Sequence, residues 1–294
     1  MKNLIKGRVC LCLSVFINAV NILNVNGQPL NTDSSSVNTV IPFANGFAHN
    51  DYCHKRPLFD ALENGFTNIE ADVFLLNGKL IVAHIFPYFK GRRTLERLYL
   101  EPLSEKVSRH NGCVFSGHTS PVTLMIDIKT DAEKTYKALK PLLDKYRHML
   151  SSYENGVVTY RAVTIVLSGH KPYAAIESEQ SRLAFIDEDL KKIPCCASNN
   201  NVFAMASCKY SDLVNWNGNG AIPVKERDKL CTFVAMAHKM GARVRLWASP
   251  EKEAVWQELL SCGVDLINTD ELAALKRYFD HKLLPNEANN KVSL

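Results

Sequence analysis

The sequence predicts an α/β fold, a (β/α)8 TIM barrel built as a single domain. Short apolar runs recur along the chain, and most are separated by segments with helical spacing, as in a parallel sheet covered by helices. There are eight such runs, and the 294 residues exceed the roughly 250 that this barrel needs. An open doubly wound sheet uses the same alternation and remains the alternative.

The strands are predicted in chain order from apolar content and alternation. The second and third runs, NIEADVFL and VTLMIDI, alternate with period two, whereas the others are short apolar stretches. The predicted strands are 47–49, 68–75, 122–128, 162–168, 183–186, 202–206, 243–248 and 265–268. Helical spacing is found over 57–64, 131–150, 224–240 and 251–261, and the fifth and sixth units have the least distinct helices.

Local signals predict two boundaries within this pattern. Asn77-Gly78 lies between two apolar runs and is typical of a tight hairpin turn, which folds the run ending at His84 back beside the second strand. Thr130 and Glu133 have the spacing of a capping box at a helix N-terminus.

The chain is interpreted as a barrel over 42–282, with a polar lead-in at 28–41 and a tail at 283–294. Residues 86–121 form a long insertion before the third strand. It is either a lid or substrate loop, or a helical excursion that packs two leucines on the barrel. These leucines are Leu95 and Leu98.

The first 27 residues are typical of an export signal. A basic start precedes the apolar run VCLCLSVFINAV, and Val25 and Gly27 supply small residues for cleavage before Gln28. Asn18 and Asn21 interrupt the run, which disfavours a membrane-spanning helix. We therefore expect a secreted, periplasmic or otherwise extracytoplasmic protein.

Charge and cysteine content exclude some classes. The net charge of +5 falls when the basic leader is removed, and no basic tract suited to nucleic acid is present. The nine cysteines lack zinc-type CxxC spacing. A disulfide within the set Cys195, Cys196 and Cys208 is one reading, and buried apolar cysteine is the other.

Glu70 and Asp72 are the first candidates for chemistry. Side chains alternate across a strand, so both point to one face of NIEADVFL while its apolar residues point to the other. Two carboxylates inside a barrel repel each other unless a cation lies between them. Carboxylate oxygens suit Mg²⁺ or Ca²⁺, and a solvated strand face is the alternative.

The third strand adds Asp127 and Lys129, which share one face of VTLMIDIK. Asp127 supplies a third carboxylate, and Lys129 a positive charge that can neutralise phosphate oxygens. A surface ion pair between them is the alternative.

Histidines lie at the ends of the predicted strands. His49 follows the first strand and His84 ends the hairpin, so both are candidates for proton transfer. His170 follows the fourth strand and is a candidate at the same mouth.

Six motifs in order resemble the glycerophosphodiester phosphodiesterase and phosphatidylinositol phospholipase C-like superfamily of metal-dependent barrels. Within it the likeness is greatest to secreted bacterial members and to the fungal altered-inheritance-of-mitochondria phosphodiesterase-like group. The motifs are AHNDY, RPLFDALENGFTNIEADVFLLNGKLIVAH, LMIDIKT, NWNGNG, RVRLWAS and GVDLINTDEL, over residues 47–279.

The resemblance implies a phosphoric diester hydrolase acting on a glycerophosphodiester or (lyso)phospholipid headgroup. It implies that Glu70, Asp72 and Asp127 are ligands of a divalent cation, Mg²⁺ or Ca²⁺, and that His49 and His84 transfer protons. Lys129, Asn50, Trp247 and His170 are then candidates for contact with substrate. Asn268 and Asp270 either line the mouth or cap the last helix.

The chain departs from the superfamily at two positions beside the histidines. Asn50 stands where arginine is usual, and Ile85 where aspartate is usual. A secreted barrel that binds headgroups without turnover is therefore an alternative, and another metal-dependent barrel enzyme a lesser one. We expect a monomer with a small-molecule or lipid phosphodiester substrate and no nucleic-acid partner, and leave peripheral membrane contact open.

Overall fold

The computed structural model describes residues 40–85, 87, 93–193 and 201–283, all within one compact unit, Thr39–Leu294. The predicted leader, most of the lead-in and the tail from 284 lie outside the described residues, so these predictions stay predictions. Within the described part, no helix is long and apolar enough to cross a membrane.

Eight parallel strands close into a barrel, as predicted. Each strand pairs with the next barrel strand along the chain, and β1 pairs with both β2 and β12, which closes the ring. This pairing excludes the open sheet. The strands are β1 (Phe43–Ala48), β2 (Phe66–Leu76), β4 (Val122–Ile128), β7 (Val163–Gly169), β9 (Ala184–Asp189), β10 (Phe203–Lys209), β11 (Arg243–Trp247) and β12 (Leu266–Thr269).

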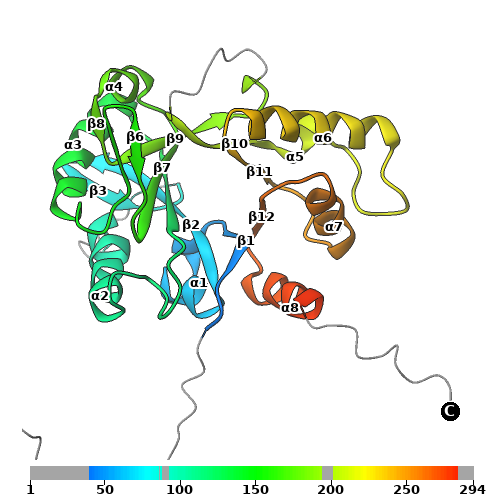
Figure 1. The fold of residues 1–294 in the computed structure, drawn as a ribbon, viewed down its shortest axis with the longest axis horizontal. Coiled ribbons are helices and arrows are strands. Elements are labelled where there is room, and N and C mark those ends of the chain that lie inside the picture. The colour runs from blue at the N-terminus through cyan, green and yellow to red at the C-terminus, as the bar shows by residue number, and fades with distance from the viewer. Residues whose placement is uncertain (1–39, 86, 88–92, 194–200, 284–294) are drawn as a thin grey trace, which may run out of the picture. The chain divides into compact units, whose positions relative to one another are not determined.

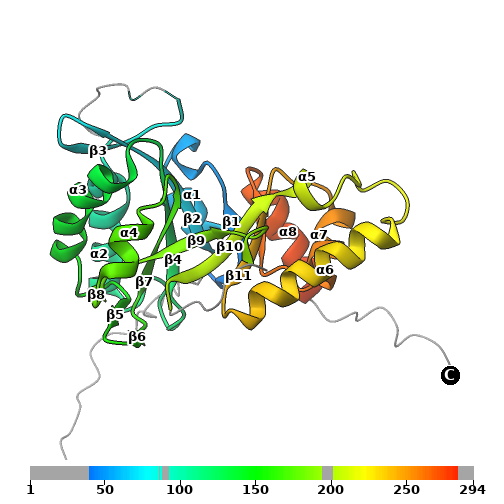
Figure 2. The same ribbon diagram turned by 90° about the horizontal axis from the view of Figure 1, so that it is seen from above.

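Helices surround this ring. Figures 1 and 2 show α2, α3 and α4 beside β2, β4 and β7, and α6, α7 and α8 beside β10, β11 and β12. The helices are α1 (Phe59–Glu63), α2 (Glu101–Arg109), α3 (Ala132–Lys145), α4 (Tyr173–Ser178), α5 (Tyr210–Leu213), α6 (Val224–Lys239), α7 (Glu253–Ser261) and α8 (Leu272–Leu283). A small sheet of β5 (Ser152–Glu154), β6 (Val157–Thr159) and β8 (Ser181–Arg182) is also present.

The core follows from strand alternation. On β2 the side chains of Ile69, Ala71 and Val73 are fully buried and join the large apolar cluster between strands and helices. A smaller cluster containing Phe47 and Met125 forms a separate group of buried side chains from several barrel strands. Because side chains alternate, Glu70 and Asp72 on β2 point to the opposite face, into the barrel.

The predicted hairpin is present. Asn77 and Gly78 adopt positive φ and connect β2 to the antiparallel strand β3 (Lys79–Val82). The predicted helix start was one residue off, because Asp131, rather than Thr130, caps α3 by accepting a hydrogen bond from the backbone N–H of Lys134 at 2.8 Å.

The 86–121 insertion is a helical excursion over its described part. A π-helical turn, η2 (Glu96–Leu100), leads into α2, with Leu95 fully buried and Leu98 packed against the core. Arg93 donates to the backbone carbonyl of Tyr52 at 2.7 Å, so it fastens the segment to the barrel. Residues 86 and 88–92 lie outside the described part.

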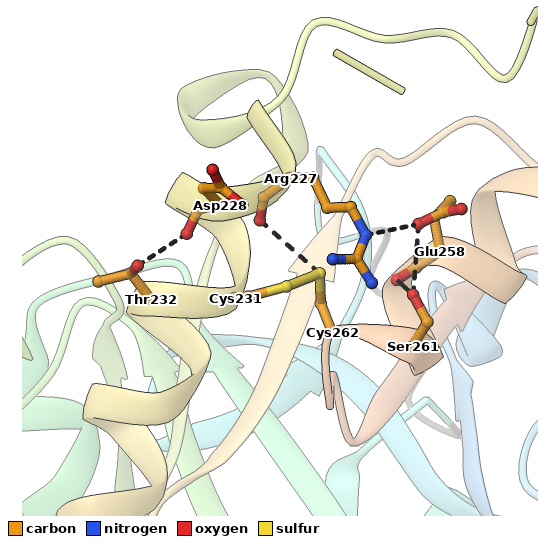
Figure 3. Close-up of a disulfide and its surroundings, with 7 residues drawn as sticks. All are labelled: Arg227, Asp228, Cys231, Thr232, Glu258, Ser261 and Cys262. Carbon is orange, nitrogen blue, oxygen red and sulfur yellow. Dashed lines mark hydrogen bonds and ion pairs between the residues drawn. A yellow bond between two sulfur atoms is a disulfide. The ribbon is translucent and has the colours of Figure 1, made fainter. Parts of the chain in front are cut away.

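A disulfide joins two helices on one side of the barrel. Cys231 on α6 is bonded to Cys262, which directly follows α7 (Figure 3). Beside it, Arg227 on α6 donates to Glu258 on α7 at 3.3 Å. Cys208 is buried without a disulfide, so buried apolar cysteine is the correct reading there, and Cys195 and Cys196 lie outside the described residues.

Candidate active site

Three carboxylates meet inside the barrel. Glu70 and Asp72 alternate along β2, and Asp127 on β4 lies in register with Asp72. One oxygen from each carboxylate lies within 4.8 Å of the others. Glu70 and Asp72 are only 4% and 2% exposed, so their charges are largely withdrawn from water. Burial raises the pKa of Asp72 to about 6, because it outweighs the positive charge of Lys129, which lowers the pKa.

The cluster fits a divalent cation. Oxygen Oδ1 of Asp127 is buried and has no hydrogen-bond partner, which leaves a free acceptor on one of the three carboxylates. Gly169 makes room for it, because a Cβ built at that residue would lie 2.0 Å from this oxygen. Three carboxylates with a free oxygen are the donors that Mg²⁺ and Ca²⁺ take.

Lys129 lies against the same carboxylates. Its Nζ is 3.1 Å from Asp72 Oδ2 and 3.1 Å from Asp127 Oδ2. Burial lowers the pKa of Lys129, but the charges of Asp127 and Asp72 outweigh that effect, so the pKa is raised and the ammonium is retained.

His49 is held by Asp270. Its Nδ1 lies 2.8 Å from Asp270 Oδ1, and a carboxylate only accepts, so Nδ1–H is the donor. Nε2 then faces the carboxylate cluster, 3.8 Å from Glu70 Oε2. Burial lowers the pKa of His49, but the hydrogen bond to Asp270 and the charges of Glu70 and Asp270 outweigh it and raise the pKa.

His84 approaches from the hairpin. The end of β3 returns beside β2, and the Ala83 N–H donates to the Asp72 carbonyl at 3.2 Å. His84 Nδ1 consequently lies 2.8 Å from the Tyr52 hydroxyl and 3.6 Å from Asp72 Oδ2. The two histidines therefore reach the carboxylates from different elements, and His84 remains more than half exposed.

Asn50 connects the two sides of the site. It adopts a left-handed conformation, φ 48°, ahead of the 3-10 turn η1 (Asp51–Cys53). Its Nδ2 donates to Asp270 Oδ1 at 3.3 Å, and its Oδ1 accepts from the Tyr52 hydroxyl at 2.7 Å. Asparagine tolerates this backbone conformation better than most residues.

These side chains surround a cavity of about 400 Å³. All of the predicted site residues except His170 line it: His49, Asn50, Glu70, Asp72, His84, Asp127, Lys129 and Trp247. His170 is not among the lining residues, and its Nδ1 is hydrogen-bonded to the backbone carbonyl of Thr130 at 2.8 Å. Trp247 is 39% exposed at the rim.

Basic residues also line the cavity. The ends of β4, β7, β9 and β10 each bring a lysine: Lys129, Lys171, Lys191 and Lys209. Arg245, 3% exposed, lies 3.4 Å from Glu70 Oε2 and 3.9 Å from Asp187 Oδ2. Such a wall offsets the charge of an anion that enters the cavity.

The sequence analysis missed Tyr52 and Arg245 as parts of this site. The alternation of RVRLW would have shown Arg245 on the same face as Trp247. Tyr52 gave no comparable signal, because its direction depends on the left-handed turn at Asn50.

The closed barrel with carboxylates and histidines at one mouth is typical of metal-dependent barrel enzymes, and sequence comparison gives the family. Residues 35–187 match the AIM6-like phosphodiesterase domain, and residues 243–273 match the glycerophosphoryl diester phosphodiesterase family. The chain belongs to the AIM6-like phosphodiesterase family, as its motifs predicted, and is a phosphodiesterase-like enzyme.

Particular relatives are fungal. Altered inheritance of mitochondria protein 6 from Eremothecium gossypii is 30% identical over 268 residues, covering 79% of this chain and 68% of that protein. A homologue from Arthroderma benhamiae is 28% identical, covering 88% of this chain and 91% of that protein. A glycerophosphodiester phosphodiesterase structure from Parabacteroides distasonis has a TM-score of 0.45 and 13% identity, covering 83% of this chain and 98% of that chain.

Proposed function

We propose that this protein is a divalent-cation-dependent phosphoric diester hydrolase that uses His49 and His84 for proton transfer. The observation that supports this function best is the convergence of both imidazoles and three carboxylates on one cavity. We further propose a glycerophosphodiester or a (lyso)phospholipid headgroup as its substrate.

Glu70, Asp72 and Asp127 would hold the cation. When bound, Mg²⁺ or Ca²⁺ would polarise the phosphoryl oxygens and offset the charge that develops on them. Lys129 adds a fixed positive charge beside the same carboxylates, and Arg245 adds another from β11. Both charges favour a phosphate anion over a neutral ligand.

The two histidines can act on opposite sides of the phosphorus. In our proposal, His49 Nε2 takes the proton of the attacking hydroxyl as the new P–O bond forms, and Asp270 stabilises the resulting imidazolium. His84 gives a proton to the leaving oxygen as the old P–O bond breaks. Attack by water yields a phosphomonoester and an alcohol, whereas attack by a substrate hydroxyl yields a cyclic phosphate and the same alcohol.

Turnover of a panel of glycerophosphodiesters, lysophospholipids and monoesters, with and without chelator, tests this function. We expect diester cleavage that is lost on chelation and restored by Mg²⁺ or Ca²⁺. His49→Ala and His84→Ala should each lose roughly 10²–10⁴-fold in turnover. His281→Ala, at an exposed position on α8, serves as the control.

Phosphorus NMR of the products separates hydrolysis from cyclisation. Tight headgroup binding without any turnover would contradict the proposal and favour the headgroup-binding alternative. Cleavage that survives both chelation and the His49→Ala substitution would exclude the proposed site.

We also propose that the enzyme is exported. The leader-like segment 1–27 supports this, and so does the disulfide between Cys231 and Cys262, since such bonds persist in oxidising compartments. N-terminal sequencing of protein recovered from the medium or periplasm should begin at Gln28. An intact leader on a cytosolic protein would contradict export.

A further inference from the structure

We infer that Tyr52 is a positioning residue that keeps a proton on Nδ1 of His84 and so directs Nε2 of that histidine to the leaving oxygen. The catalytic part of this inference rests on the proposed function. The tautomer itself can be measured without any turnover.

The Tyr52 hydroxyl lies at the centre of three polar groups. It is 2.8 Å from His84 Nδ1, 2.8 Å from Asp72 Oδ2 and 2.7 Å from Asn50 Oδ1. The tyrosine is 2% exposed, and its ring stacks beside the imidazole with centroids 6.2 Å apart and an interplanar angle of 26°. A buried, fixed phenol therefore contacts an exposed histidine that has few other restraints.

Counting protons determines the direction of each hydrogen bond. A phenol has one proton to donate, and Asp72, as a carboxylate, only accepts. Asn50 presents Oδ1 to the Tyr52 hydroxyl, while its Nδ2 lies 3.3 Å from Asp270 Oδ1 and 3.0 Å from His49 Nδ1. The single hydroxyl proton can therefore satisfy only one of these two acceptors, and a further proton among these groups has to come from His84.

It follows that His84 must donate to Tyr52. If Nδ1 carried a lone pair instead, one proton would have to serve all three contacts of the phenol oxygen, whereas Nδ1–H brings a second proton to them. With Nδ1–H fixed, Nε2 is the atom that gains and loses the catalytic proton.

Tyr52 gives His84 a polar partner that the neighbouring residue Ile85 cannot provide. A catalytic imidazole is usually oriented by a polar partner on its second nitrogen. His49 has Asp270 for this purpose, but Ile85, next to His84, is apolar and exposed. The Tyr52 hydroxyl is the polar partner that orients His84.

Tyr52→Phe removes the hydroxyl and keeps the ring. With an alkyl alcohol as leaving group, which needs a proton to depart, we expect kcat at saturating cation to fall roughly 10–100-fold, by analogy with loss of other imidazole-orienting partners. With p-nitrophenolate, which departs without a proton, kcat should change less than about 3-fold. His84→Ala should show the same dependence, and the double variant should be no slower than His84→Ala alone.

Tyr136→Phe is the matched control. Tyr136 is also 2% exposed and donates to a carboxylate, that of Glu179, at 2.7 Å, but it lies on α3 away from the cavity lining. This variant reports the general cost of removing a buried phenol oxygen. It should leave kcat unchanged with both the alkyl alcohol and the p-nitrophenolate leaving group.

Nitrogen-15 NMR of the imidazole rings gives an independent readout. At a pH where His84 is neutral, the wild type and Tyr136→Phe should show the Nδ1–H tautomer, and Tyr52→Phe a mixture with Nε2–H. A wild-type Nε2–H tautomer, or an equal loss with both leaving groups, would overturn the inference. If no diester is turned over at all, the proposed function fails while the NMR result still decides the role of Tyr52.

Discussion

Single residues set the geometry of the carboxylate cluster, and Gly169 is the clearest case. It ends β7 with φ +68°, and any Cβ there would press on Asp127 Oδ1 and on the Ile128 carbonyl at 2.5 Å. The position therefore requires a residue without a side chain. The cluster depends on this space as much as on its own acids.

Gly169→Ala should therefore weaken cation binding. We expect Mg²⁺ or Ca²⁺ affinity, measured by calorimetry, to fall at least about 10-fold because Asp127 must move. Gly156→Ala is the control, since Gly156 also has positive φ but nothing lies within 4 Å of a Cβ there. It should cost about 1 kcal/mol of stability and leave affinity unchanged. Equal affinities in the two variants would contradict the prediction.

Asp51 predicts a dependence of stability on pH. It is fully buried, accepts from the Leu58 N–H and the Tyr99 hydroxyl, and burial raises its pKa to about 6 from 3.8. Because the folded pKa is the higher one, the stabilising effect is complete below pH 3.8 and is lost as pH rises through 6. The loss is about 3 kcal/mol.

Asp51→Asn should remove that loss. Relative to wild type, the variant should gain about 2 kcal/mol in urea unfolding between pH 4 and pH 7. For Asp228→Asn, on the outer helix α6, the free energy of unfolding should depend on pH as it does in the wild type. If the free energy of unfolding of Asp51→Asn had the same pH dependence as that of the wild type, Asp51 would not titrate in this range.

The carboxylates could be predicted from the sequence because their direction follows from strand alternation. Glu70, Asp72 and Asp127 were found because period two fixes the face of each. Tyr52 was missed and Asp270 was left between lining the mouth and capping the last helix, because a side chain's direction in a turn depends on local φ and on partners far along the chain. His49 and Asp270 are 221 residues apart, and no local pattern reports such a pair.

At the scale of elements, the strands were predicted better than the helix ends. All eight runs became barrel strands because apolar alternation is enforced by the core on one side. The start of α3 was misplaced because two residues compete for the cap. Thr130 Oγ1 accepts from the Leu75 N–H instead, which ties β4 to β2 and leaves Asp131 to cap the helix.

The disulfide between α6 and the end of α7 should stabilise the fold. It closes a loop with a sequence separation of 31, for which chain entropy gives about 3–4 kcal/mol. The double variant Cys231→Ser/Cys262→Ser should lose that much in denaturant unfolding, whereas Cys53→Ser, at an exposed free cysteine, should not. Equal stability of all three proteins under oxidising conditions would refute this expectation.

At the scale of the whole molecule, the cluster predicts that cations stabilise the fold. A ligand that binds only the native state at 100 times its Kd adds about 2.7 kcal/mol. Mg²⁺ or Ca²⁺ should therefore raise Tm, and chelator should lower it again. The shift should vanish in Asp127→Asn and persist in Asp280→Asn, whose carboxylate pairs with Lys276 on α8. A cation shift that survives Asp127→Asn would contradict the site.

The hairpin of β2 and β3 has a consequence for how such enzymes diversify. Among the named strands β3 pairs only with β2, so residues can be inserted or exchanged in it while the ring of eight stays closed. His84 follows this appendage, whereas His49 follows a strand of the ring itself. New substrate preferences can thus evolve, or be engineered, on one half of the reaction centre while the other half keeps its inherited shape.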